Sequence, residues 1–200
     1  MIARAAAKDG WNVTVFLAEG EPKTADAIRN FERLHSLPVH ICTDGSVLET
    51  QSFAAVVDAL YGTGFHSELR PSGLAACGLI RHLHKSGAFV LAVDLPSGIN
   101  TDTGEVAEGA AHADLTVTFD SYKPLHIAKT SAPLCGKIVC ADIGIPGRMA
   151  PGVLTRLAAA EKHLHAKDPG SFQGTPGFFL SFCCKMSALS WQNAENAETA

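Results

Sequence analysis

Short apolar runs alternate with longer segments of helical periodicity along most of the chain. A run of four to six consecutive apolar residues is typical of a strand that is buried on both faces of a sheet. Residues 89–93 (FVLAV) are the clearest case, because all five positions are apolar. The pattern predicts strands at residues 13–17, 39–41, 54–60, 89–93, 115–119 and 138–141.

Two segments between these runs have the spacing of amphipathic helices. Residues 24–34 repeat apolar side chains on one face, and Thr24 can cap the start of the helix. Residues 74–85 form a second such segment, with Pro71 near its start and Gly87 just past its end. Strands separated by helices predict an α/β protein, a Rossmann-like three-layer αβα sandwich with a mostly parallel sheet.

The composition narrows the class of function. The chain has 200 residues, of which 46% are hydrophobic and 18% charged, and its net charge is −4. An acidic chain without a basic stretch lacks the electrostatic footprint of a nucleic-acid or membrane-surface binder. No apolar run approaches the roughly 20 residues that span a bilayer, and charges break the apolar part of residues 1–10. We therefore expect a cytoplasmic protein with no nucleic-acid or membrane partner.

Three predicted strands end in an aspartate, namely Asp58, Asp94 and Asp120. In open α/β sheets, ligands bind beyond the carboxyl ends of the strands. A single aspartate there often only caps a turn, but the loops after the first two suit the close approach of a ligand. We expect these loops and carboxylates to converge on one nucleotide site.

The loop after the strand at 54–60 is the first candidate binding segment. Its glycines let the backbone approach a phosphate, and its hydroxyl groups can donate hydrogen bonds. A flexible turn is the alternative, because the loop lacks the G-x-G-x-x-G pattern. The candidate substrate-binding residues are Gly62, Thr63, Gly64, Phe65, His66, Ser67 and Glu68.

The corner at residues 94–100 (DLPSGIN) is the second candidate. Pro96 fixes a turn, and Gly98 permits an unusual backbone angle. Ser97 and Asp58 offer hard oxygen ligands, which suit an alkali or alkaline-earth cation better than zinc. Capping of the next turn is the alternative role for these two side chains.

Lys123 follows the strand at 115–119 within the sequence YKP. It can contact a phosphate or take part in proton transfer, although a lone loop lysine is usually a solvated charge. Neither G-x-S-x-G nor a P-loop occurs, so a serine hydrolase or an NTPase lacks support.

Several of these segments, taken in order, resemble one family, the YjeF N-terminal domain or NAD(P)H-hydrate epimerase family. Each motif is modest alone, but their order and spacing are highly specific. The resemblance covers residues 1 to about 147. The segments that carry it are VDALYGTG at 57–64, AVDLPSGINTDTG at 92–104, ADLTVTF at 113–119 with Lys123 and Pro124, and ADIGIP at 141–146.

The resemblance implies a substrate and a cation. Members of the family interconvert the R and S epimers of NADHX and NADPHX, and a separate dehydratase then restores the reduced cofactor. By similarity, Asp58 and Ser97 would bind K⁺, residues 62–68 and Asp94 would contact the hydrated nucleotide, and Lys123 would lie beside them. We therefore expect Asp94 and Lys123 to be the catalytic residues. As a hypothesis, Asp94 donates a proton to the departing hydroxyl and later helps return water to the other face.

The chain departs from the family at both ends. The family's G-x-N-N-G-G-D-G loop is missing, and residues 1–4 match those that should follow it, so we expect the first strand and helix to be absent. That loss should expose a sheet edge or an apolar face. We expect residues 1–147 to form the truncated domain, 148–175 to be a linker that includes a helix at 153–165, and 176–200 to be a disordered tail. A dehydratase domain is expected in the full-length protein, and a homodimer remains open.

Two other classes of function compete with the epimerase. One is a non-catalytic nucleotide-binding or scaffold module on the same fold, which the missing loop favours. The other is a nicotinamide dehydrogenase, which the absence of its glycine fingerprint disfavours. Asp58, Asp94, Ser97 and Lys123 favour the enzyme lineage.

Overall fold

A computed structural model describes residues 1–66, 68–144 and 177–182 of the chain, the last of these through the backbone alone. The six predicted strands and the two predicted helices of residues 13–141 are present, and the structure adds a helix at Ile2–Lys8 and a strand at Gly177–Phe182. The helices are α1 (Ile2–Lys8), α2 (Ala25–Glu32) and α3 (Pro71–Lys85), with 3₁₀ turns at Ser46–Leu48, Pro124–His126 and Ala132–Leu134. The strands are β1 (Asn12–Phe16), β2 (Val39–Cys42), β3 (Ala55–Ala59), β4 (Phe89–Val93), β5 (Leu115–Phe119), β6 (Lys137–Ala141) and β7 (Gly177–Phe182).

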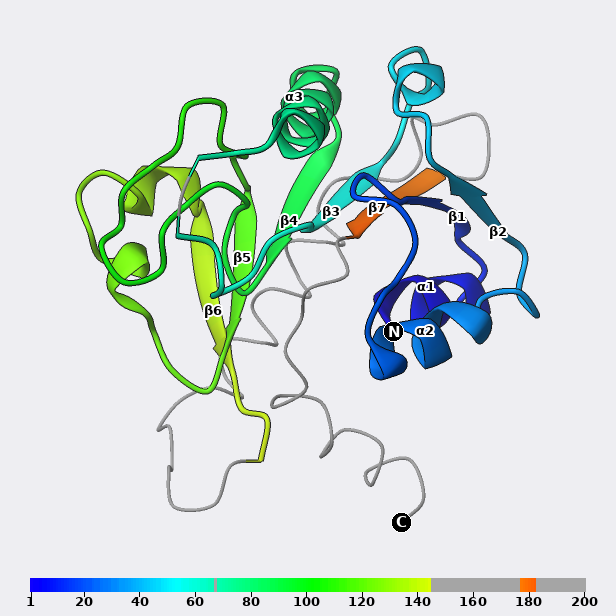
Figure 1. Cartoon of the computed structure of the whole chain (residues 1–200), viewed down its shortest axis with the longest axis horizontal. Helices are drawn as coiled ribbons and strands as arrows, with labels where there is room; N and C mark the ends of the chain where they lie inside the picture. Colours follow the sequence, from blue (N-terminus) through cyan, green and yellow to red (C-terminus); the bar gives the residue numbers. More distant parts are fainter. Residues whose placement is uncertain (67, 145–176, 183–200) are drawn as a thin grey trace.

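The strands form one sheet in the order β2-β1-β7-β3-β4-β5-β6, and every neighbouring pair is parallel. Helix α3 covers one face, and α1 and α2 cover the other (Figure 1). Consecutive strand residues point to opposite faces, so Val56 packs in the cluster under α3 and Val57 in the cluster under α1. The αβα sandwich with a parallel sheet is therefore confirmed.

The sequence pattern predicted most helix and strand boundaries to within two residues of those in the structure. Strands β4 and β5 coincide with the predicted runs, and Thr24 caps α2 by accepting a hydrogen bond from the Ala27 N–H at 3.4 Å. Helix α3 begins at Pro71 rather than at residue 74, because proline suits the first helical position, where no N–H is needed. Helix α2 has no buried residue, so its apolar face is only partly covered.

Strand β7 corrects two expectations. The sequence pattern left residues 176–200 outside the fold, but residues 177–182 form a strand between β1 and β3. The expectation of an exposed sheet edge between β1 and β3 is wrong for the same reason, since each of these strands pairs with β7. The backbone N–H and C=O groups of two strands provide a strong driving force for pairing, and a distant segment satisfies them.

The predicted linker at 148–175 and the helix at 153–165 lie outside the described residues. Among those that are described, no helix combines the length and apolar character that crossing a bilayer would require.

Candidate functional site

The candidate residues lie at the carboxyl edge of β3, β4 and β5. The strands are parallel and in register, with Asp58 of β3 opposite Ala92 of β4, so their carboxyl ends meet at one edge. Asp94 follows β4 directly and has a positive φ of 71°, which is uncommon for a residue with a side chain. Two hydrogen-bonded clusters result, one around Asp58 and one around Asp94.

The first cluster joins Asp58 to the Pro-Ser-Gly corner. Ser97 donates to the Asp58 carboxylate twice, from its N–H to Oδ2 at 2.7 Å and from its hydroxyl to Oδ1 at 2.5 Å. The Leu60 N–H donates to the same carboxylate at 3.3 Å. Both residues are buried, since Asp58 is 1% exposed and Ser97 is 0% exposed. The turn itself depends on Gly98, whose φ is 95° and where a Cβ would approach Ala110 to 2.9 Å.

The donors of this cluster fit an alkali cation. Burial raises the pKa of Asp58, while the hydrogen bonds from Ser97 and Leu60 oppose that effect. Within the described residues, no lysine, arginine or histidine forms an ion pair with Asp58. A carboxylate has about four lone-pair sites and three donors already occupy it, so one position remains for a cation. The Asp58 carboxylate and the Ser97 hydroxyl are the hard oxygen atoms of this cluster that could hold a cation.

Tyr61 fixes the start of the glycine loop at three points. Its N–H donates to the Ser97 hydroxyl at 3.0 Å, and its phenol donates to Glu19 at 2.6 Å. Its ring packs against Phe65, with the ring centroids 5.4 Å apart. Glu19 also accepts from Ser72 at 2.8 Å and from Arg70 at 3.2 Å. The loop is therefore tied both to the Asp58 cluster and to the start of α3.

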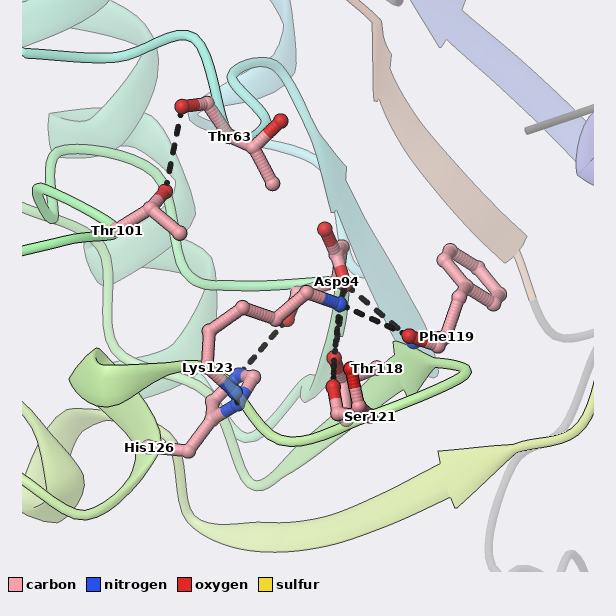
Figure 2. A network of polar contacts seen from close by, with 8 residues as sticks. All are labelled: Thr63, Asp94, Thr101, Thr118, Phe119, Ser121, Lys123 and His126. Atoms are coloured by element: carbon pink, nitrogen blue, oxygen red, sulfur yellow. Dashed lines mark hydrogen bonds and ion pairs between the residues drawn. The ribbon is translucent and has the colours of Figure 1, made fainter. Parts of the chain in front are cut away.

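The glycine loop presents open backbone. A Cβ added at Gly62 or Gly64 would meet nothing within 4 Å, and neither residue has a positive φ. These glycines are therefore not required by the turn, and the space over them is available to a ligand. The Thr63 carbonyl accepts a hydrogen bond from Thr101 at 3.4 Å (Figure 2). Phe65 is half-buried, His66 and Glu68 are exposed, and Ser67 lies outside the described residues.

The second cluster holds Asp94 and Lys123 together, as Figure 2 shows. The Lys123 ammonium lies 2.5 Å from Asp94 Oδ1, and the side chains are 19% and 12% exposed. The Thr118 hydroxyl and the Phe119 N–H donate to the same oxygen at 2.8 and 3.3 Å. Lys123 also donates to the hydroxyl oxygen of Thr118 at 2.7 Å and to the Phe119 carbonyl at 3.0 Å. Lys123 is thus an ion-paired side chain rather than a solvated charge.

The two oxygens of Asp94 are used differently. Every hydrogen bond recorded for this carboxylate within the described part of the chain goes to Oδ1. Oδ2 is therefore the oxygen that can exchange a proton with a ligand, while Oδ1 anchors the group.

Sequence reasoning missed three residues of these clusters. His126 accepts the Lys123 N–H at 3.0 Å and contacts the Asp94 carbonyl at 3.0 Å. No sequence signal marked it, because residues 123–126 lack the Ser or Thr and the Glu or Gln of a capping-box sequence. Glu19 lies shortly after β1, near the carboxyl end of its strand as Asp58 is in β3 and Asp94 is after β4, so the rule applied to the aspartates would have found it. Thr118 carried no signal, because its side chain is one of several in an ordinary strand.

A three-layer α/β protein with a carboxylate–lysine pair at the carboxyl edge of its sheet belongs to the class of Rossmann-like proteins that bind ligands at that edge. Comparison with known proteins narrows the class. The family described as YjeF-related protein N-terminus matches residues 1–125. This chain belongs to that family.

Relatives and a solved structure agree with this assignment. An NAD(P)H-hydrate epimerase of Cenarchaeum symbiosum is 34% identical over 160 residues, which are 76% of this chain and 70% of that protein. The bifunctional NAD(P)H-hydrate repair enzyme Nnr of Archaeoglobus fulgidus is 36% identical over 181 residues, 84% of this chain but 37% of that enzyme. The crystal structure of yeast ynu0 shares the fold, with a TM-score of 0.51 and 22% identity over 88% of this chain and 68% of that one. The chain therefore spans little more than a third of the bifunctional relative.

Proposed function

We propose that this chain is an NAD(P)H-hydrate epimerase, which interconverts the R and S forms of NADHX and NADPHX. The observation that carries the proposal is the Asp94–Lys123 pair, with Oδ2 of Asp94 left for a ligand at the carboxyl edge of the sheet. The names of the relatives support the reaction and the substrate.

The proposed chemistry needs only a proton and water. The hydroxyl leaves the carbon beside the ring nitrogen with the electrons of the C–O bond, and it takes a proton from Asp94 Oδ2 to become water. The nitrogen lone pair forms a C=N bond and carries the positive charge. Water then adds to the other face, the C=N electrons return to the nitrogen, and the released proton returns to Asp94. Lys123, 2.5 Å from Oδ1, orients the carboxyl group and stabilises the carboxylate that is left once the proton has moved to the departing hydroxyl.

The glycine loop is the proposed contact for the nucleotide. Gly62 and Gly64 leave their backbone open, and the anchor at Tyr61 holds the loop in place. Preorganised backbone of this kind suits a phosphate, because the N–H groups need no rearrangement when the anion binds.

Potassium is proposed at Asp58 and Ser97. When bound, the ion would supply positive charge beside the buried carboxylate. The side-chain oxygen atoms of Asp58 and Ser97 would hold the ion. Ser97 would then link the cation to the glycine loop, because its hydroxyl accepts the hydrogen bond from the Tyr61 N–H.

The wider assembly is also a proposal. A dehydratase domain in a longer protein agrees with the word bifunctional in the names of several relatives. A homodimer and the cytoplasmic location stay predictions.

Conversion of R-NADHX to S-NADHX by the purified chain, followed by chromatography, tests the function. We expect turnover by the wild type, and loss of about 10² to 10⁴-fold in kcat for Asp94→Asn, the usual contribution of general acid–base catalysis. The matched control is Asp102→Asn, an exposed carboxylate in a neighbouring loop. It should retain wild-type activity.

Two outcomes contradict the proposal. One is normal turnover by Asp94→Asn. The other is a wild-type chain that binds NADPHX, measured by calorimetry, but leaves the ratio of epimers unchanged, which supports the nucleotide-binding module.

A further inference from the structure

His126 connects the backbones of the two residues in the second cluster. Its Nδ1 lies 3.0 Å from the Lys123 N–H, and its Nε2 lies 3.0 Å from the Asp94 carbonyl oxygen. The imidazole is 3% exposed, so it does not reach a ligand over the sheet edge. The ring therefore acts on the Asp94–Lys123 pair through these backbone contacts.

The chemistry of the two partners fixes one protonation state of the ring. A backbone N–H can only donate, so Nδ1 must be the unprotonated acceptor. A backbone carbonyl can only accept, so Nε2 must carry the hydrogen. The neutral Nε2–H tautomer satisfies both contacts, whereas an imidazolium would set two N–H donors against each other at Lys123. The groups that face the ring with charge or a titratable proton are Asp94, Lys123 and Tyr122, whose ring meets His126 edge-on at 6.1 Å.

One of the two partners, Asp94, has a backbone conformation that needs such support. Asp94 has a φ of 71°, a conformation that costs an ordinary residue on the order of 1 kcal/mol or more and persists only where contacts over-determine it. Lys123 precedes Pro124 and is extended, with φ −98° and ψ 161°. A ring hydrogen-bonded to both residues sets the distance between the end of β4 and the turn that begins at Pro124.

We propose that neutral His126 is a positioning residue that sets the geometry of the Asp94–Lys123 pair by bridging their backbones. The inference rests on the proposed function only in so far as this pair carries out the epimerisation. It predicts that the ring affects the chemical step more than the affinity for substrate, because it touches the reacting pair and not the ligand.

The test combines a spectroscopic and a kinetic measurement on the full chain. In the ¹⁵N-labelled wild type, long-range ¹H–¹⁵N spectra should show His126 as the Nε2–H tautomer at neutral pH. His126→Phe keeps a ring of similar size but removes both contacts, and it should shift the ¹³C signal of the Asp94 carboxyl group and speed hydrogen exchange at the Lys123 ammonium. His126→Asn retains an acceptor in the place of Nδ1 and should restore part of both signals.

The kinetic arm uses the same variants. His126→Phe should lower kcat on the order of 10²-fold with little change in KM, since small misplacements of reacting groups cost that much. His126→Asn should recover part of kcat. The control is His112→Phe, an exposed histidine that contacts the Pro133 carbonyl at 3.0 Å, and it should leave kcat and the Asp94 and Lys123 signals unchanged.

The outcomes separate this inference from the proposed function. An Nδ1–H tautomer or an imidazolium in the wild type overturns the inference, and so do unchanged Asp94 and Lys123 signals in His126→Phe. Full kcat in a folded His126→Phe overturns it as well. If the wild type has no epimerase activity, the proposed function fails, and the spectra alone still decide whether His126 positions the pair.

Discussion

Replacing Ser97 by alanine removes the group that joins Asp58 to the glycine loop. The change deletes the 2.5 Å hydrogen bond to the Asp58 carboxylate and leaves the Tyr61 N–H without the acceptor that it has at 3.0 Å. The Ser97 N–H and the Leu60 N–H still donate to Asp58, so the carboxylate loses one donor of three.

The magnitude follows from the type of each bond. A hydrogen bond to a charged group contributes about 1.5 to 3 kcal/mol to stability, and a neutral one contributes about 0.5 to 1.5 kcal/mol. Because Asp58 keeps two donors, the lower half of the summed range applies. We expect Ser97→Ala to reduce the free energy of unfolding by about 2 to 3 kcal/mol.

Urea unfolding followed by circular dichroism measures this quantity. The control is Ser36→Ala, an exposed serine whose hydroxyl donates to the Arg33 carbonyl at 3.4 Å, and it should change stability by less than about 0.5 kcal/mol. A double-mutant cycle with Asp58→Asn should give a coupling energy of at least about 1 kcal/mol, because the two side chains are in direct contact. A Ser97→Ala variant as stable as the wild type, or a coupling energy near zero, would refute the reasoning.

Three further predictions follow from the same clusters. Tyr61→Phe removes the 2.6 Å hydrogen bond to the Glu19 carboxylate and should lower the free energy of unfolding by about 1.5 to 3 kcal/mol. It should also raise KM several-fold at constant kcat, and an unchanged KM would contradict the role of the anchor. Burial alone would raise the pKa of Glu19, but hydrogen bonds from Tyr61 and Ser72 and the charge of Arg70 lower it below the ordinary value of 4.5. The stability that the ionised Glu19 contributes is therefore present above pH 4.5 and is lost as the pH falls through the lower pKa of the folded state. Urea unfolding at a series of pH values should show that loss in the wild type and not in Glu19→Gln. Potassium chloride should raise the thermal midpoint above that in choline chloride of equal ionic strength, with about 2.7 kcal/mol of stabilisation at 100 times the Kd, and Asp58→Asn should abolish the difference.

The two clusters of the site show how much of it could be predicted from local sequence patterns. The sequence led to Asp58, Ser97 and Asp94 because strand ends and a Pro-Ser-Gly corner are patterns within a few residues, whereas the resemblance to the family pointed to Lys123. The structure brings Ser97 to Asp58 and Lys123 to Asp94, as the sequence predicted for one edge of a sheet. The role of K⁺ at the first pair and of catalysis at the second stays a prediction.

The contacts that the sequence did not indicate join residues far apart in the chain. Glu19 lies 42 residues from Tyr61, and His126 lies 32 residues from Asp94. No periodicity or spacing relates such positions, because their distance depends on how the strands are ordered in the sheet. Their roles were therefore visible only once the sheet was assembled.

The pattern of apolar residues by itself determined strands β1 to β6 and helices α2 and α3, since burial on both faces of a parallel sheet requires continuous apolar runs. It did not indicate α1. It also placed the aspartates at the ends of strands. Only the tertiary structure decided that residues 177–182 pair between β1 and β3, and that Lys123 and Asp94 meet over a buried imidazole. The physical reason is the same in both cases. Which distant segments form hydrogen bonds depends on the donors and acceptors that are still unsatisfied in the rest of the fold, and a local sequence pattern does not show which groups these are.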